Sequence, residues 1–176
     1  MPKLIENISR QLLEETGRQL AAQGYARTTI RSVAGACGLG VGTVYNYFPS
    51  KEHMVASYVA RDWARTLETM EAEPASDPRA RLETIHRQLL AFTQHHRVLF
   101  SDQDAARAAA GVMLSRHLQL REQLAALIEP IAPSSDGFDA RFIAEALLTW
   151  TISNAPFDRI YEMLGELIPG NKEDSK

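Results

Sequence analysis

Apolar residues recur at helical intervals along most of the chain, and this pattern predicts an all-α protein. Long helices are expected over about 3–23, 50–72 and 138–155. Prolines at 74 and 78 end the second of these helices, and Pro156 ends the third. A further helix is predicted from Pro78, with Asp77 as its N-cap. A long helical segment that ends at about 131 follows, and a last helix is predicted from 157 to 168. About nine helices are expected in total.

Between residues 28 and 51 the pattern changes to two short helices joined by a glycine turn. Thr29 is suited to cap the first helix, whose apolar residues share one face: Ile30, Val33, Ala34 and Cys37. Gly38 is expected at a left-handed position that ends this helix, because a side chain with a Cβ is strained there. The apolar residues that follow point back toward the first helix: Leu39, Val44 and Phe48.

This arrangement leaves one face of the second short helix directed outward. Its residues are small, hydroxyl-bearing, amide or phenolic: Gly42, Thr43, Tyr45, Asn46 and Tyr47. Such a face can approach a duplex groove closely, donate hydrogen bonds and place aromatic rings against the sugar-phosphate edge. The pattern therefore indicates a nucleic-acid-binding helix.

The same segment resembles the helix-turn-helix of the tetracycline-repressor (TetR) family of bacterial transcriptional regulators. The resemblance covers about residues 10–55 and depends on the following features: Gly24-Tyr25, Thr28-Thr29, Val33-Ala34, Gly38, and Gly42-Thr43-Val44-Tyr45-x-Tyr47-Phe48-x-Ser50-Lys51. It implies an N-terminal three-helix DNA-binding domain, residues 1–50, continued by a fourth helix into a helical effector-binding and dimerisation domain, residues 51–170. The polar residues 171–176 are expected to form a disordered tail.

The resemblance also implies which residues contact DNA. The residues expected to contact bases or the groove floor are Val41, Gly42, Thr43 and Tyr45. Those expected to contact the DNA backbone or flanking bases are Asn46 and Tyr47. Thr29 and Arg31 are expected at a phosphate or an outer base, and Lys51 at a phosphate, helped by the helix dipole. Two simpler alternatives stay open: packing within the domain for the two tyrosines, and a solvated surface charge for Arg31.

Charge is distributed unevenly along the chain. Residues 1–65 carry 8 Lys and Arg against 5 Asp and Glu, whereas residues 66–176 carry 11 against 17, within an overall net charge of −3. The helix-turn-helix therefore lies in the basic part, as attraction to phosphate requires. One cysteine excludes an internal disulfide framework, and the absence of a signal peptide or long apolar run fits a cytoplasmic protein without a membrane partner.

The cysteine and the histidines offer other chemistry, which we weigh against simpler interpretations. Cys37 is interpreted as a small buried residue and not as a redox sensor, because no basic neighbour lowers its thiol pKa. A metal site among His86, His95, His96 and His117 is not expected. Adjacent His95 and His96 should diverge on a helix, and neither has a Cys or carboxylate ligand at i+3 or i+4.

The last two helices carry more apolar surface than one face needs, which indicates a subunit interface. In the family these helices form a four-helix bundle between two chains, so a homodimer through about 138–168 is implied. Two heads would then reach successive major grooves about 34–36 Å apart, at a palindromic operator. Candidates for the lining of an effector pocket, each with plain core packing as the alternative, are Trp63, His86, Phe92, Met113, His117 and Trp150.

The leading interpretation is a homodimeric repressor that a small-molecule effector releases from DNA. The alternative is a DNA-binding architectural or division-related protein with the same head and no effector. An enzyme is not expected, because the sequence has no nucleophile motif, no phosphate-cradling glycine loop and no metal cluster. No catalytic residue, metal or cofactor is assigned.

Overall fold

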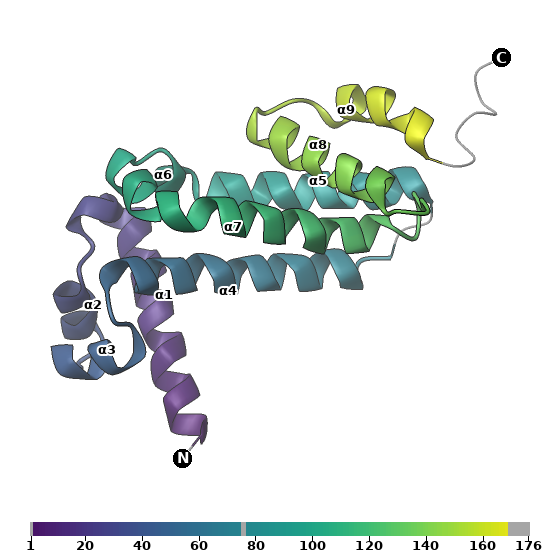
Figure 1. Ribbon diagram of the computed structural model, residues 1–176. Coiled ribbons are helices and arrows are strands. Elements are labelled where there is room, and N and C mark those ends of the chain that lie inside the picture. The colour runs from purple at the N-terminus through teal and green to yellow at the C-terminus, as the bar shows by residue number, and fades with distance from the viewer. Residues whose placement is uncertain (1, 75–76, 169–176) are drawn as a thin grey trace. The chain divides into compact units, whose positions relative to one another are not determined.

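The protein is described here from a computed structural model, which covers residues 2–74 and 77–168; the side chains of residues 2–6, 106–116 and 166 lie outside this description. Within these ranges the chain forms nine α-helices and one 3-10 helix, and no strand (Figure 1). This confirms the all-α prediction.

The helix bounds follow the sequence pattern closely. They are α1 (Pro2–Arg27), α2 (Ile30–Ala36), α3 (Val41–Tyr47), α4 (Lys51–Ala72), α5 (Pro78–His95), α6 (Arg97–Phe100), α7 (Gln103–Ile128), α8 (Phe138–Ile152) and α9 (Phe157–Leu164), with the 3-10 helix at Gly165–Leu167. Helices α7 and α8 each end three residues earlier than expected, at 128 and 152 instead of 131 and 155.

The chain divides into two compact units. Unit 1 comprises the residues up to Ala64 together with His95–Gly111, and unit 2 comprises Arg65–Gln94 and the chain from Val112 onward. Unit 1 therefore contains more than the first fifty residues, because the first part of α4 and the short helix α6 pack with the N-terminal helices.

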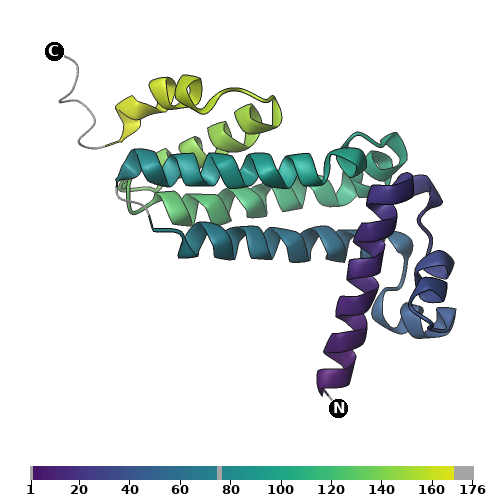
Figure 2. The same cartoon turned by 180° about the vertical axis from the view of Figure 1, so that it is seen from behind.

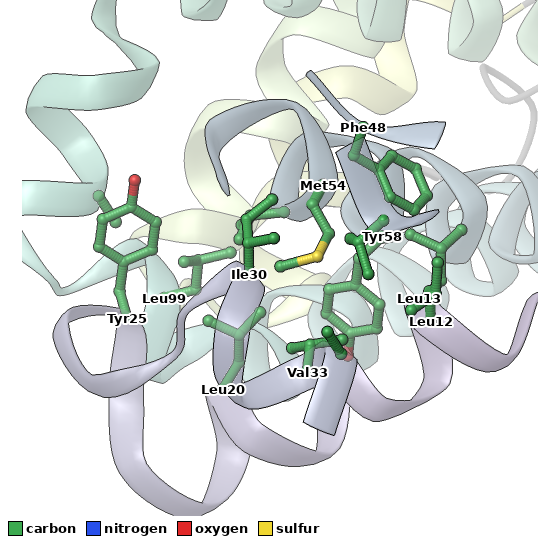
Figure 3. Packing of buried hydrophobic residues seen from close by; sticks show 14 residues of the cluster. Leu12, Leu13, Leu20, Tyr25, Ile30, Val33, Phe48, Met54, Tyr58 and Leu99 are labelled. Carbon is green, nitrogen blue, oxygen red and sulfur yellow. The ribbon is translucent and has the colours of Figure 1, made fainter. Parts of the chain in front are cut away.

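The core of unit 1 is built around the first part of α4. Met54 is fully buried, and Figure 3 shows side chains of α1, α2 and α4 converging around it. The buried cluster consists of Leu12, Leu13, Leu20, Tyr25, Ile30, Val33, Ala34, Val44, Phe48, Met54, Val55, Tyr58, Leu99 and Ala105. Because α6 contributes Leu99 and packs on α1, it belongs to the same core as the helix-turn-helix.

Two glycines shape α1. Gly24 has φ +79° and interrupts the helical backbone just before its last turn, which agrees with the helix end predicted at about residue 23. Gly17 lies under the ring of Tyr58, where an added Cβ would come within 2.5 Å of the ring. The helix therefore carries glycine at position 17, despite its low helix propensity, to let the α4 aromatic ring approach.

Unit 2 is assembled from amphipathic helices. Asp77 accepts a hydrogen bond from the Ala80 amide at 2.8 Å, which confirms the predicted cap of α5. Every α-helix of this unit contributes buried apolar side chains: Met70, Leu82, Ile85, Leu89, Leu124, Ile128, Ile143, Leu147, Ile160 and Leu164. Figure 2 shows α9 folded back beside α8, with which it packs.

None of the helices in the described ranges is long and apolar enough to span a bilayer.

Candidate DNA-binding interface

The start of α2 is fixed by reciprocal hydrogen bonds. The Thr29 hydroxyl accepts from the Ser32 amide, and the Ser32 hydroxyl accepts from the Thr29 amide, both at 3.0 Å. Ser32 also donates to Gln19 of α1 at 2.6 Å, so the cap is joined to the first helix. Nothing in the sequence pattern pointed to Gln19, because 13 residues and a turn separate it from its partner Ser32. The Thr29 hydroxyl can also donate its own proton, since a hydroxyl can accept and donate together.

The turn between α2 and α3 depends on Gly38. Its φ of +68° lies in the left-handed region, as the sequence predicted. The amide of Leu39 then donates to the Ala34 carbonyl at 2.9 Å, which closes the end of α2. This short turn directs α3 across the end of α2, against which it packs.

Helix α3 separates its residues as the sequence predicted for Val44, Gly42, Tyr45 and Asn46, whereas Tyr47, predicted to face outward, packs partly against the core. Val44 is fully buried, whereas Tyr45 is 52% exposed and Gly42 and Asn46 are exposed. Val41 and Tyr47 are only partly buried and pack against the core of unit 1. Helix α3 thus presents Gly42, Tyr45 and Asn46 to solvent, flanked by half-buried Thr43 and Tyr47.

Lys51 at the start of α4 is held by Tyr25. Its amine donates to the Tyr25 carbonyl at 2.6 Å and lies 3.7 Å from the centre of the Tyr25 ring. Burial lowers the pKa of the Lys51 amine. The Tyr25 hydroxyl donates to Glu52 at 3.2 Å. Burial together with the Glu52 carboxylate raises the pKa of the Tyr25 hydroxyl to about 12. Lys51 and Tyr25 therefore join α4 to the turn after α1, and a phosphate contact by Lys51 stays a prediction.

Two exposed arginines add positive charge to the unit that contains α3. They are Arg31 in the first turn of α2 and Arg27 at the end of α1. Exposed cations of this kind can strengthen the attraction to phosphate. Arg27 was not among the predicted contacts.

Cys37 ends α2 in a half-buried position. Its sulfur lies 3.9 Å from the Gln11 carbonyl, and burial raises the pKa of the thiol. A raised pKa disfavours the reactive thiolate, which supports the structural interpretation of this residue.

The six candidates for an effector pocket fall in both units. Trp63 is buried in unit 1, whereas His86, Phe92, His117 and Trp150 belong to unit 2, and the Met113 side chain lies outside the described residues. His86 is buried, with its Nε2 3.2 Å from the Ala155 carbonyl. His117 Nε2 lies 2.9 Å from both carboxylate oxygens of Glu145.

Trp150 is 51% exposed, on the outer face of α8. A side chain this exposed does not suit the wall of a pocket within one chain. Trp150 is better explained as part of a surface that another molecule covers.

The inference that His95 and His96 diverge on a helix is wrong. Helix α5 ends at His95, and His96 has φ −93° and ψ 9° as the residue before α6. Both imidazoles therefore turn toward Asp62 of α4, whose Oδ2 lies 3.6 Å from His95 Nε2 and 3.5 Å from His96 Nε2.

Comparison with known proteins supports the same segment as the functional one. Residues 12–58 match the family described as "Bacterial regulatory proteins, tetR family". The "HTH-type transcriptional repressor KstR" of Rhodococcus jostii is 32% identical over 80 residues, which is 46% of this chain and 38% of that protein. The matched part of the chain therefore spans well under half the length of this relative.

Two longer matches extend beyond the helix-turn-helix. The "Fatty acid metabolism regulator protein" of Bacillus subtilis is 20% identical over 85% of this chain and 87% of its own length. A TetR-family transcriptional regulator from Streptomyces coelicolor shares the fold, with a TM-score of 0.62 and 20% identity over 91% of this chain and 99% of that one. Residues 12–58 therefore carry the helix-turn-helix of the tetR family of bacterial regulatory proteins, and the chain shares its fold with a TetR-family regulator.

Proposed function

We propose that the protein is a homodimeric transcriptional repressor of the cytoplasm that binds a palindromic operator and is released by a small-molecule effector. The observation that carries this proposal is the outward face of α3, where Gly42, Tyr45 and Asn46 are exposed on a helix held by the Gly38 turn. A regulator acts by binding, and no residue is assigned a catalytic role.

The outward face of α3 suits the major groove. Gly42 permits a close approach because nothing lies within 4 Å of its missing Cβ. The Asn46 amide can donate and accept at a base edge, and the Thr43 and Tyr45 hydroxyls can donate to phosphate or bases. Arg31 and Arg27 add charge that every DNA sequence attracts equally, so they contribute affinity and not specificity.

Dimerisation is supported by apolar residues on the outer face of α8. Phe138, Phe142 and Trp150 are 60%, 48% and 51% exposed, and the rings of the two phenylalanines stack with centres 6.0 Å apart. Together with Ala146 they are spaced four residues apart and form one stripe. The opposite face of α8 is already buried, so this stripe is surplus to the core of unit 2. A second copy of α8 would bury it.

Effector binding is proposed for unit 2. The Bacillus subtilis relative is named as a regulator of fatty acid metabolism. Fatty acids and their derivatives are therefore the first compounds to test in a thermal-shift screen, ahead of a wider panel of metabolites and drugs. An effector raises the melting temperature by mass action and lowers the affinity for operator DNA, because it binds the released state better.

DNA binding is tested by fluorescence anisotropy on the DNA that flanks the gene of this protein. Tyr45→Ala and Arg31→Ala are compared with Arg65→Ala, which removes an exposed arginine of unit 2 outside residues 138–168. We expect Tyr45→Ala to weaken binding about 10-fold or more, and Arg31→Ala to weaken it while lowering the salt slope by about 1. Arg65→Ala should bind like the wild type. No binding at low salt by the wild-type protein would contradict the proposal.

The dimer is tested by light scattering coupled to size-exclusion chromatography. Phe142→Glu places a charge in the middle of the α8 stripe and should yield a folded monomer with much weaker operator binding. Glu83→Ala, on the exposed side of α5 and outside residues 138–168, is the control and should stay dimeric. A wild-type protein that is monomeric at micromolar concentration would contradict a homodimer.

A further inference from the structure

Three metal-ligating side chains meet in unit 1, and none of them belongs to α3. Asp62 comes from α4, His95 from the end of α5 and His96 from the residue before α6. One ligand atom from each lies within 4.8 Å of the other two. We propose that these residues form a binding site for a divalent first-row transition ion of the Zn²⁺ type, with Asp62 Oδ2, His95 Nε2 and His96 Nε2 as ligands.

The distances between the ligand atoms fit such an ion. A tetrahedral ion with ligands about 2.0–2.1 Å away holds its ligand atoms roughly 3.3–3.4 Å apart. Asp62 Oδ2 lies 3.6 Å from His95 Nε2 and 3.5 Å from His96 Nε2. Side-chain adjustments of a few tenths of an ångström therefore suffice for these two pairs, and the two imidazole nitrogens lie within 4.8 Å of each other.

The local fold explains why adjacent histidines converge. The bend between α5 and α6 sets the two imidazoles nearly perpendicular, at 86°, with ring centres 4.9 Å apart. Neither ring stacks on the other, so both edges can reach the carboxylate. His96 is packed between the rings of Tyr58 and Phe100, 5.3 and 5.7 Å away, which fixes its orientation.

Neighbouring groups complete the surroundings of the site. Arg61 Nε lies 3.8 Å from Asp62 Oδ1, so this cation faces the carboxylate oxygen that the ion does not use. The Tyr58 hydroxyl lies 2.9 Å from His95 Nε2 and also hydrogen-bonds Asp62. Coordination at Nε2 requires the His95 tautomer with its proton on Nδ1, and Tyr58 then keeps its bond to Asp62 as an outer-shell partner.

The chemistry of the ligands selects the class of ion. Two imidazoles and one carboxylate suit Zn²⁺, Fe²⁺, Co²⁺ or Ni²⁺, whereas Mg²⁺ and Ca²⁺ prefer oxygen ligands alone. Three protein ligands leave an open position for water. The His95 side chain is 62% exposed while that of His96 is 2% exposed, so the ion can enter past His95 and be held against a buried ligand.

The site is tested by isothermal titration of tag-free, EDTA-treated full-length protein with Zn²⁺, and with Co²⁺ for its visible absorption. We expect one tight ion per chain, a higher melting temperature and the absorption of nitrogen- and oxygen-ligated Co²⁺. His95→Asn and Asp62→Asn should each weaken Zn²⁺ binding by more than about 10–100-fold, the range for losing an outer-shell partner alone. Because His95 is largely exposed, its variant is expected to fold.

The matched control is His117→Asn, which removes the other histidine bonded to a carboxylate, Glu145. It should leave the tight ion in place. The proposal is overturned if the wild type binds no Zn²⁺ at micromolar concentration, or if His95→Asn and Asp62→Asn bind it as tightly as the wild type. Loss of the tight ion in His117→Asn alone would also overturn it, by assigning the ion to α7 and α8.

Discussion

Replacing Gly17 with alanine separates helix propensity from packing, because the two effects have opposite signs. Alanine in the interior of a helix is more favourable than glycine by about 1 kcal/mol, so propensity alone predicts that Gly17→Ala stabilises α1. The structure predicts the reverse, because the new Cβ would lie 2.5, 2.7 and 2.9 Å from Cε2, Cζ and Oη of Tyr58.

The magnitude follows from how far Tyr58 has to move. Carbon atoms are comfortable at about 3.5–4.0 Å, so the ring must shift by roughly 1 Å. Tyr58 is buried, and its hydroxyl is hydrogen-bonded to His95. Overpacking of a filled core typically costs about 1–3 kcal/mol. After the gain in propensity, Gly17→Ala is expected to lower the free energy of unfolding by about 0–2 kcal/mol.

The control is Gly35→Ala in α2, where nothing lies within 4 Å of the new Cβ. It should raise stability by up to about 1 kcal/mol, so the two variants should differ by roughly 1–3 kcal/mol. Urea unfolding followed by circular dichroism at one protein concentration measures this difference. Equal stabilisation by both substitutions would refute the packing of Tyr58 on Gly17, and the Tyr58→Leu background should remove most of the penalty.

Three further predictions concern the turn, the cap and pH. Gly38→Ala should destabilise the protein by about 1–2 kcal/mol, because φ is +68° there, whereas Gly40→Ala, with φ −69°, should be nearly neutral in the same urea assay. Thr29→Ala removes the acceptor of the Ser32 amide and should cost about 1 kcal/mol; a change below the error of the measurement would contradict the cap. Burial, and secondly the neighbouring His95, lower the pKa of His96 to about 4 from the ordinary 6.5. The folded protein therefore disfavours protonated His96 relative to the unfolded chain. The stability that neutral His96 contributes is complete above pH 6.5 and is lost as the pH falls through 4. In EDTA, the free energy of unfolding should fall by about 2 kcal/mol more between pH 7 and 5 for the wild type than for His96→Gln, and parallel pH profiles would contradict this.

Local signals accounted for much of the fold. The Gly38 turn, the Gly24 break and the cap at Asp77 each depend on one residue whose backbone preference is strong enough to be read from the sequence. The division of α3 into a buried Val44 and an exposed Tyr45 followed from helical periodicity in the same way. These features needed no information about distant residues.

Contacts between distant segments were not predictable. The need for glycine at position 17 depends on the ring of Tyr58, 41 positions later in the chain. The position of the Lys51 amine depends on a carbonyl 26 positions earlier. The convergence of His95 and His96 depends on where α5 ends: one further turn of helix would have separated the rings. Periodicity does not determine a helix end to within one residue, so the cluster with Asp62 could not be predicted from it.

The proposed role as a repressor is tested most directly by a DNase I footprint on the bound DNA. The account predicts two protected half-sites related by a dyad, with centres about 10–10.5 base pairs or a multiple of that apart, as two copies of α3 in successive major grooves require. Tyr45→Ala should lose this protection at a concentration where the wild type is saturated. Protection of a single half-site, or equal protection by both proteins, would contradict the account.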